Sequence, residues 1–173
     1  MNIFLIGYMG SGKSKTGEAL AKALNYSFVD TDQLIEKQTG KTIAELFFAP
    51  GPEEFRLMEK KLIRNLSEET NQVISTGGGL PCYFDNMEWM NDHGLTIYLE
   101  ANAGLLFHRL VRNRKGRPLI ENISDVNLME QIQNHLIDRV PVYEQAQLKV
   151  GAASLDVKML TSEVLKILEK QST

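Results

Sequence analysis

Residues 7–14 read Gly-Tyr-Met-Gly-Ser-Gly-Lys-Ser and fit the spacing G-x-x-x-x-G-K-S. Gly10 and Gly12 leave no Cβ in the way, so successive backbone N–H groups can curl around phosphate oxygens. A helix that begins near Lys13 would point its positive end at the same anion. We expect Lys13 to reach the β- and γ-phosphates of a nucleotide and the Ser14 hydroxyl to ligate Mg²⁺. A plain glycine-rich turn is the competing interpretation, and the position between a strand and a helix argues against it.

The rest of the sequence narrows the class of phosphate chemistry. A GTPase needs an N-K-x-D-like guanine motif, which this sequence lacks. A motor-type ATPase would have an apolar strand that ends in Asp-Glu, whereas the third predicted strand runs into Ser75-Thr76-Gly77-Gly78-Gly79. The aspartate nearest to a strand end is Asp30. These features favour a kinase that acts on a small molecule.

Two carboxylates follow the second predicted strand, in the sequence Asp30-Thr31-Asp32. Residues i and i+2 of a strand point the same way, so Asp30 and Asp32 can both face the crevice at the carboxyl edge of the sheet. The alternative is that Thr31 or Asp32 only caps the next helix, which begins near Gln33.

A second group of polar residues suits a hydroxylated acid as the phosphate acceptor. Arg56 and Glu59 are three residues apart and share a helix face. The guanidinium can fork onto a carboxylate, and the carboxylate can accept hydroxyl protons. Residues 77–79 are three glycines that offer backbone N–H groups. Taken singly, these features could also be a surface ion pair and a flexible turn.

Five cations lie within residues 109–117 of a chain whose net charge is −3. For Arg114 and Lys115 we favour a solvated helix end. Arg117 precedes Pro118 and a loop-like stretch, residues 118–125, which suits a mobile lid. An arginine on a closing loop can neutralise charge on the transferred phosphoryl group and contribute ~10³ or more in rate.

Short apolar runs alternate with longer helical patterns, which predicts βαβ units and a parallel sheet. The class is α/β: a three-layer α/β/α sandwich with a central five-stranded parallel sheet, of the P-loop NTPase type, with a mobile lid. The expected strands are Asn2–Ile6, Ser27–Val29, Gln72–Ser75, Leu95–Leu99 and Leu148–Val150. The expected helices are residues 13–24, 53–66, one after Ala101, 125–139 with its end limited by Pro141, and one that carries Val157, Leu160, Val164, Ile167 and Leu168 on one stripe. In the first helix, Thr16, Ala19, Leu20, Ala23 and Leu24 are expected to share the inner face.

Composition excludes several classes. The chain has 173 residues, 43% of them hydrophobic and 24% charged, as in a soluble single domain. The small negative charge gives nucleic acid or an acidic membrane no global attraction. Cys82 is the single cysteine, expected to be a small buried hydrophobe in a reducing compartment. No run approaches a membrane span, and residues 1–6 suit a strand better than a signal peptide, so we expect a cytoplasmic protein.

Together these motifs resemble the shikimate kinase family, with its nucleoside monophosphate kinase-like fold. The matching features are the loop of residues 7–14, Asp30-Thr31-Asp32, Phe55-Arg56-x-x-Glu59, residues 77–79, Arg117-Pro118-Leu119 and Arg139-x-Pro-x-Tyr143, in family order over residues 7–143. The resemblance implies transfer of the γ-phosphoryl group of ATP to the 3-hydroxyl of shikimate, in the biosynthesis of chorismate and aromatic amino acids. It also implies Mg²⁺, and ATP and shikimate as the small-molecule substrates. We expect a monomer with no nucleic acid or membrane partner.

The resemblance assigns roles to the matched residues. The shikimate site would consist of Asp32 on the hydroxyls, Arg56, Arg139 and the Gly78–Gly79 backbone on the carboxylate, and Glu59 supporting the arginines or the far hydroxyl. The ATP site would consist of Gly10, Ser11, Gly12, Lys13, Ser14, Lys15, Arg109 and Arg117, with Arg109 stacked on adenine. Asp30 would hold a Mg²⁺-bound water beside Ser14. Lys13, Asp32 and Arg117 would carry the catalysis.

The implied organisation is one kinase domain, residues 1–173, with a lid at about 112–125 and a shikimate-binding segment at about 32–62. Three departures affect the nucleotide side. Lys15 stands where the family usually has threonine, the loop at residues 151–153 lacks a common proline, and an extra residue before Arg117 leaves Arg109 and Arg112 as competing adenine contacts. Two other functions remain open: another small-molecule kinase such as a gluconate kinase, and a nucleotide-binding module without catalysis.

Overall fold

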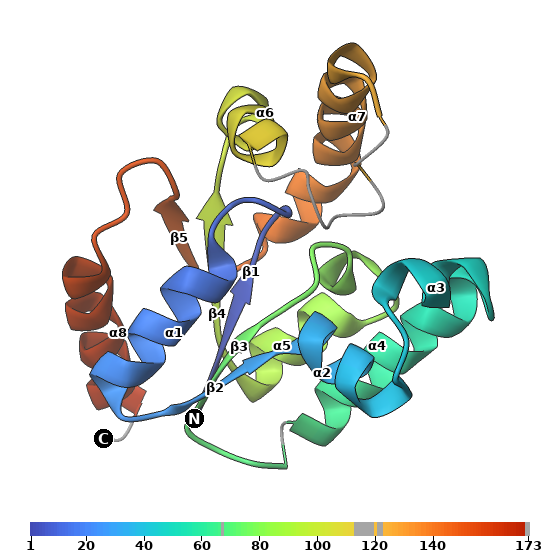
Figure 1. Ribbon diagram of the computed structural model, residues 1–173. Helices are drawn as coiled ribbons and strands as arrows, with labels where there is room; N and C mark the ends of the chain where they lie inside the picture. The colour runs from blue at the N-terminus through green and yellow to red at the C-terminus, as the bar shows by residue number, and fades with distance from the viewer. Residues whose placement is uncertain (67, 113–119, 121–122, 172–173) are drawn as a thin grey trace.

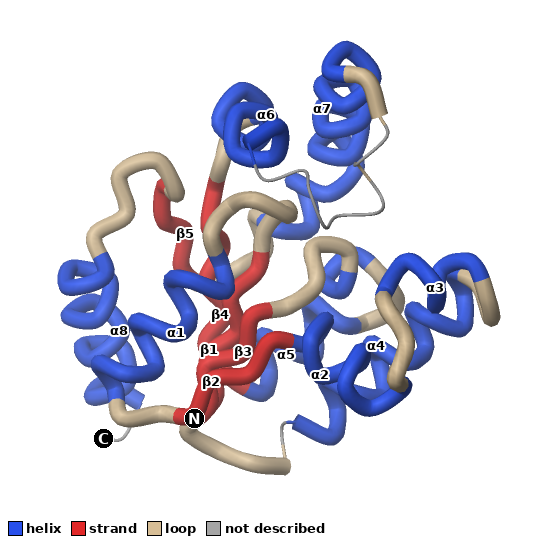
Figure 2. Tube along the Cα trace, in the orientation of Figure 1, coloured by secondary structure: helices blue, strands red, loops and turns tan. Residues whose placement is uncertain are grey.

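Figure 1 shows a computed structural model of the chain, which describes residues 1–66, 68–112, 120 and 123–171. Five parallel strands form one sheet in the order β2-β3-β1-β4-β5. Their bounds are β1 Asn2–Ile6, β2 Ser27–Asp30, β3 Gln72–Ser75, β4 Gly94–Glu100 and β5 Leu148–Gly151. All five predicted strands are confirmed, three of them with ends extended by one residue. Because the strands are parallel, their carboxyl ends meet at a single edge, from which the loops rise towards α6 and α7 (Figures 1 and 2).

The helices join the strands as crossovers. They are α1 Lys13–Leu24, α2 Thr31–Thr39, α3 Ile43–Phe48, α4 Pro52–Leu66, α5 Asn86–His93, α6 Ala103–Arg112, α7 Asp125–Tyr143 and α8 Val157–Gln171, with a short 3₁₀ helix at Leu80–Cys82. The helices α3 and α5 were not predicted from the sequence. The three-layer α/β/α architecture is confirmed.

Strand β1 shows why the sheet needs helices on both faces. Ile3 and Leu5 belong to one buried cluster with residues of α1, α6 and α8. Phe4 and Ile6 alternate to the other face and pack with residues of α4, α5 and the end of α7. All four side chains are 0% exposed. A third cluster, Ile35, Leu46, Phe55 and Leu62, joins α2, α3 and α4 beside the sheet.

Two expectations about helices are wrong. In α1, Ala19 and Ala23 are exposed, and Gly17 and Ala21 are buried instead. The reason is close contact: a Cβ on Gly17 would lie 2.5 Å from the Phe28 ring, so this is the face that meets the sheet.

The helix α7 does not stop near Arg139 but continues through Pro141 to Tyr143. A proline inside a helix removes one backbone hydrogen bond. Pro141 lies on the exposed side of α7, where water can replace that bond. The last turn is held by Tyr143, whose ring is fully buried in the second cluster.

Candidate active site

The phosphate loop connects β1 to α1. Gly10 and Gly12 have φ of 83° and 101°, a left-handed conformation that favours glycine, and Gly12 is the N-cap of α1. The Lys13 side chain is buried and folds back over the loop, with Nζ donating to the carbonyl oxygens of Gly7 at 2.8 Å and Tyr8 at 3.0 Å. The loop, the helix start and the ammonium therefore face the same space, as a phosphate cradle requires.

Oxygen donors suited to Mg²⁺ lie beside the loop. The Ser14 hydroxyl donates to Asp30 Oδ2 at 2.7 Å, and Ser75 Oγ is 3.5 Å from Ser14 Oγ. A hydroxyl and a carboxylate at the carboxyl edge of the sheet are hard oxygen ligands, the kind that Mg²⁺ prefers. The pair therefore fits the predicted direct contact from Ser14 and the water-mediated contact from Asp30.

Asp30 also caps the helix α2, a role that the sequence analysis considered for Thr31 or Asp32. The strand ends at Asp30 and α2 begins at Thr31, so Asp30 is the cap: its Oδ1 accepts hydrogen bonds from the backbone N–H of Asp32 at 3.1 Å and Gln33 at 3.3 Å. Capping by Thr31 or Asp32 is wrong, and so is the idea that Asp32 continues the strand. Asp32 instead lies in the first turn of the helix, with its carboxyl directed at Gly77.

The three glycines after β3 form the floor of the acceptor side. A Cβ on Gly77 would lie 2.5 Å from Asp32 Oδ1 and 2.9 Å from Glu59 Oε1, and one on Gly79 would lie 2.6 Å from Arg56 Nη2. The carboxylates and the guanidinium thus rest directly on backbone, which only glycine permits. The Gly77 N–H is held by Thr31 Oγ1 at 2.8 Å.

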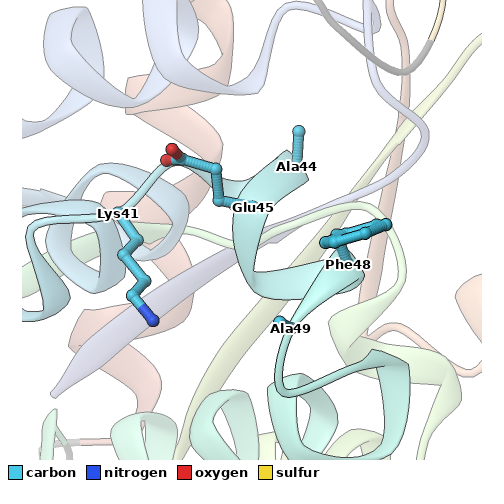
Figure 3. A pocket seen from close by; sticks show the side chains of 5 residues that line it. All are labelled: Lys41, Ala44, Glu45, Phe48 and Ala49. Atoms are coloured by element: carbon cyan, nitrogen blue, oxygen red, sulfur yellow. The ribbon is translucent and has the colours of Figure 1, made fainter.

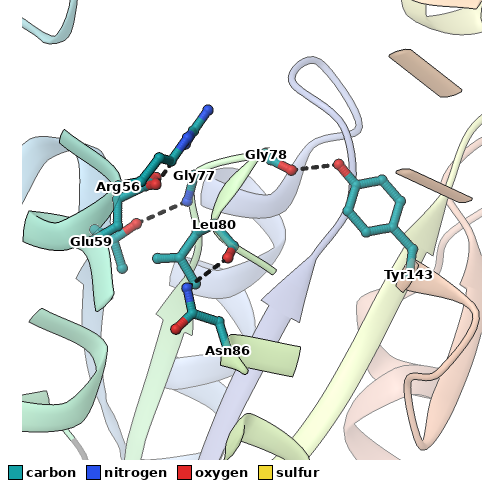
Figure 4. A network of polar contacts seen from close by, with 8 residues as sticks. Arg56, Glu59, Gly77, Gly78, Leu80, Asn86 and Tyr143 are labelled. Carbon is teal, nitrogen blue, oxygen red and sulfur yellow. Dashed lines mark hydrogen bonds and ion pairs between the residues drawn. The ribbon is translucent and has the colours of Figure 1, made fainter. Parts of the chain in front are cut away.

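Arg56 and Glu59 form a buried ion pair on α4, with Arg56 Nη1 2.5 Å from Glu59 Oε2 (Figure 4). Phe47, Phe55 and Tyr83 surround the guanidinium, with its Cζ 5.2, 5.3 and 4.2 Å from the respective ring centroids. Such cation–π contacts restrict the arginine to one orientation. The expectation that the pair shares one helix face is confirmed, and the surface ion pair is excluded because both side chains are less than 10% exposed.

Two polar atoms of this pair have no hydrogen-bond partner among the described residues: Arg56 Nε and Glu59 Oε1. Buried polar groups are normally satisfied, because an unmade hydrogen bond costs about 1–3 kcal/mol. Arg56 Nε–H is a hydrogen-bond donor and Glu59 Oε1 is an acceptor. The two atoms together indicate a place for a ligand that has both acceptor and donor groups.

Two carboxyl groups on the acceptor side have raised pKa values. Burial, together with the smaller effect of the nearby Asp30 carboxylate, raises the pKa of Asp32 to about 6. Burial raises the pKa of Glu59 to about 7, against the opposing effect of Arg56. Two carboxyls with raised pKa values beside cationic groups are typical of functional sites.

The helix α7 supplies the far wall. Arg139 lies over the Tyr8 ring, with its Cζ 5.5 Å from the centroid, and its Nη1 would be 3.7 Å from a Cβ on Gly78. One turn further on, the buried Tyr143 hydroxyl donates to the carbonyl oxygen of Gly78 at 2.5 Å (Figure 4). Gly78 also abuts the phosphate loop, since a Cβ there would be 3.3 Å from the Met9 nitrogen. The acceptor side and the phosphate loop are therefore adjacent.

On the nucleotide side, Arg109 of α6 binds the phosphate loop from outside. It donates to the carbonyl oxygens of Gly10 at 3.2 Å, Ser11 at 2.9 Å and Ala152 at 2.9 Å. Arg112 is exposed at the end of the same helix. The geometry favours Arg109 over Arg112 as the residue near a bound nucleotide.

The remaining predicted residues lie as follows. The Ser11 side chain is buried within the loop, and Lys15 is exposed on α1. Arg117 and most of the predicted lid, residues 113–119 and 121–122, lie outside the described residues. Cys82 is half-buried, and burial raises the pKa of its thiol to about 11, as expected of an unreactive cysteine.

Sequence reasoning missed several residues of the site. The Phe47 and Tyr83 rings beside Arg56 belong to none of the matched motifs, because their contacts join distant segments. Thr31 and Phe55 lie within matched motifs, but the sequence interpretation gave their side chains no role in the site. A separate hollow, lined by Lys41, Ala44, Glu45, Phe48 and Ala49, lies at α3 and includes no predicted site residue (Figure 3). Within the described ranges, no helix is both long and apolar enough to cross a membrane.

Comparison with known proteins agrees with this geometry. Residues 9–169 match the shikimate kinase family. A shikimate kinase of Phocaeicola vulgatus is 44% identical over 156 residues, 90% of this chain and 89% of that protein. The crystal structure of shikimate kinase from Bacteroides thetaiotaomicron superimposes with a TM-score of 0.91 at 40% identity, over 98% of each chain.

Two further structures show how similarity falls from another shikimate kinase to a different kinase of the same fold. Shikimate kinase from Acinetobacter baumannii, in complex with shikimate, has a TM-score of 0.85 at 30% identity and covers 98% of this chain and 93% of its own. A gluconokinase from Sinorhizobium meliloti has a TM-score of 0.61 at 18% identity, covers 99% of this chain and 97% of its own, and shares the fold alone. The phosphate loop, the carboxyl groups of Asp32 and Glu59 and the Arg56 guanidinium are thus set in a chain that belongs to the shikimate kinase family.

Proposed function

We propose that this chain transfers the γ-phosphoryl group of ATP to the 3-hydroxyl of shikimate, giving shikimate 3-phosphate and ADP. The observation that carries the proposal is the pocket floor of residues 77–79. The carboxyls of Asp32 and Glu59 and the Arg56 guanidinium converge on it, with Arg139 at its edge. A small acid with several hydroxyls needs cationic forks for its carboxylate and carboxylates for its hydroxyls. The pocket supplies both, next to a phosphate loop.

In this mechanism the protein mainly positions the two substrates and neutralises charge on the transferred phosphoryl group. Asp32 would orient the attacking hydroxyl in line with the γ-phosphoryl group, since a loose transition state needs little help from a base. Lys13 would leave the loop carbonyls to contact the β- and γ-phosphates. Arg56 and Arg139, with the backbone of Gly78 and Gly79, would hold the acid group.

The other groups act on charge and access. Ser14 would bind Mg²⁺ directly, and Asp30 would bind one of its waters. When bound, this ion would neutralise charge on the β- and γ-phosphates. Arg117, on a closing lid, would neutralise charge on the transferred group, and Arg109 would contact adenine. Lys15 adds a positive charge near the phosphates at the start of α1.

We also propose that the protein works as a cytoplasmic monomer with small-molecule substrates, and without nucleic acid or membrane partners. The net charge of −3 and the single cysteine support this proposal.

The test measures ATP consumption through coupled detection of ADP, with shikimate, gluconate or no acceptor. We expect turnover with shikimate alone, and ³¹P NMR of the product should place the phosphate on the 3-hydroxyl. Arg56→Lys is a sharp companion variant, because it keeps the charge but loses the fork. Turnover of gluconate in place of shikimate, or equal ADP release without any acceptor, would refute the proposal.

A further inference from the structure

The Tyr8 side chain makes a contact that none of the roles above uses. Tyr8 belongs to the phosphate loop and is only 3% exposed. Its hydroxyl lies 2.8 Å from Nδ1 of His135, and the two ring centroids are 5.9 Å apart. The partners are 127 residues apart in sequence, so the contact ties the loop to α7.

The helix α7 reaches both halves of the site through residues spaced four apart. His135, Arg139 and Tyr143 lie on one stripe of the helix. The first bonds Tyr8, the second lies over the Tyr8 ring, and the third donates to the Gly78 carbonyl oxygen. Arg139, which is proposed to bind the substrate carboxylate, therefore lies on α7 between His135, which contacts the phosphate loop, and Tyr143, which contacts the pocket floor.

The Tyr8 backbone, in turn, is hydrogen-bonded to Lys13, which is proposed to contact the nucleotide phosphates. Its carbonyl oxygen accepts from Lys13 Nζ at 3.0 Å and from the Ser11 nitrogen at 3.1 Å. A triphosphate in the loop draws the ammonium towards its own oxygens, which removes one hydrogen bond from the Tyr8 peptide. The loss of this hydrogen bond would connect nucleotide binding to the backbone of residue 8.

We infer that the Tyr8–His135 hydrogen bond couples the two substrate sites, so that a nucleotide in the phosphate loop favours the Arg139 position that grips the acid group of the acceptor. This inference rests on the proposed function. Tyr8 and His135 would be positioning residues, since their proposed effect passes through Lys13 and Arg139. Coupling of this kind is reciprocal, because each ligand must change the affinity for the other by the same factor.

The protonation states suit this contact. Burial raises the pKa of the Tyr8 hydroxyl, which keeps it neutral and able to donate. Burial and the Arg139 cation lower the pKa of His135, against the effect of Asp138, so the imidazole is neutral at pH 7.5. In the tautomer that carries its proton on Nε2, the tyrosine O–H donates to Nδ1; in the other tautomer, Nδ1–H donates to the tyrosine oxygen.

The experiment measures shikimate affinity by isothermal titration calorimetry at pH 7.5, with and without saturating Mg·ADP. The proteins are the wild type, Tyr8→Phe, His135→Ala and the double variant. The matched control is Tyr26→Phe, at the far end of α1, about 18 Å from the loop by helix rise. Melting temperatures are recorded for all five.

We expect the wild type to bind shikimate more tightly when Mg·ADP is present. Each single variant should lose about fivefold of that enhancement, the size of one neutral hydrogen bond, while its affinity for either ligand alone changes less than twofold. The double variant should lose no more than the singles, because both remove the same contact. Tyr26→Phe should keep the full enhancement.

Two results would overturn the inference. One is an enhancement in Tyr8→Phe and His135→Ala equal to that of the wild type. The other is a loss of affinity for each ligand alone together with a lower melting temperature, because that is what a merely structural contact would give. A wild type that binds no shikimate would instead refute the proposed function, and the inference would fall with it.

Discussion

Replacing Gly79 by alanine should weaken the acceptor site while the backbone at residue 79 keeps its conformation. Gly79 has φ −86° and ψ −22°, a conformation that alanine adopts freely. The added Cβ would lie 2.6 Å from Arg56 Nη2 and 2.8 Å from its Cζ, where ordinary contact begins at 3.4 Å. The guanidinium must therefore move by about 0.8 Å, and it is the end of a flexible side chain that can do so.

The size of the effect follows from what that displacement breaks. A charge-assisted hydrogen bond contributes about 1.5–3 kcal/mol, and every 1.4 kcal/mol is a factor of ten. Because Arg56 would shift both from Glu59 and from the acid group of shikimate, we expect KM for shikimate to rise about 10- to 100-fold. The KM for ATP should change less than threefold, because the phosphate loop is untouched.

Steady-state kinetics with each substrate varied in turn, together with a thermal melt, give the readout. Gly104→Ala on α6 is the control, since the nearest atom to its added Cβ is Asn102 Oδ1 at 3.5 Å. It should leave both KM values unchanged and slightly raise the melting temperature. The reasoning fails if Gly79→Ala binds shikimate as the wild type does, or if both KM values rise equally.

Other changes test other parts of the site. Arg117→Ala should lower kcat by about 10³ with shikimate affinity nearly unchanged, and a normal kcat in single-turnover assays would refute the lid assignment. The kcat/KM for shikimate should fall as pH drops through about 6, where Asp32 protonates; a flat profile from pH 8 to 5 would contradict this. The raised pKa means that the folded state binds the Asp32 proton more tightly than the unfolded state does. Ionisation of Asp32 therefore destabilises the fold, and the free energy of unfolding decreases as pH rises from 3.8 to about 6. Asp32→Asn should therefore be inactive yet more stable by roughly 1–3 kcal/mol at pH 7.5, but no more stable at pH 3, as urea unfolding can measure. Tyr143→Phe leaves the Gly78 carbonyl oxygen without this donor and should cost about 1–2 kcal/mol, seen as a melting temperature lower by a few degrees.

Some of this protein could be predicted because the responsible residues are neighbours in sequence. The phosphate loop needs only consecutive residues between a strand and a helix, so residues 7–14 carry its whole signal. Apolar periodicity placed all five strands to within a residue at either end. It also placed Arg56 and Glu59 on one helix face, where the structure has them 2.5 Å apart.

Prediction was poorer where a local rule competes with long-range packing. Proline usually limits a helix, but the buried ring of Tyr143 holds one more turn beyond Pro141. Ala19 has a higher helix propensity than Gly17, but propensity does not say which residue faces the sheet, and only the close approach of the Phe28 ring decides that Gly17 does. Asp30 and Asp32 look equivalent in the sequence, yet one caps α2 and the other turns towards Gly77.

The sequence by itself determined the chemistry on offer: a phosphate loop, carboxylates, arginines and a run of glycines, in an order typical of one kinase family. Only the tertiary structure decided that Asp32 from α2, Glu59 from α4 and Gly77 after β3 meet within contact distance. It alone revealed that Tyr8 and His135 bond across 127 residues. The physical reason is that such contacts depend on how helices pack against the sheet, and this packing leaves no periodic or local trace in the order of the residues.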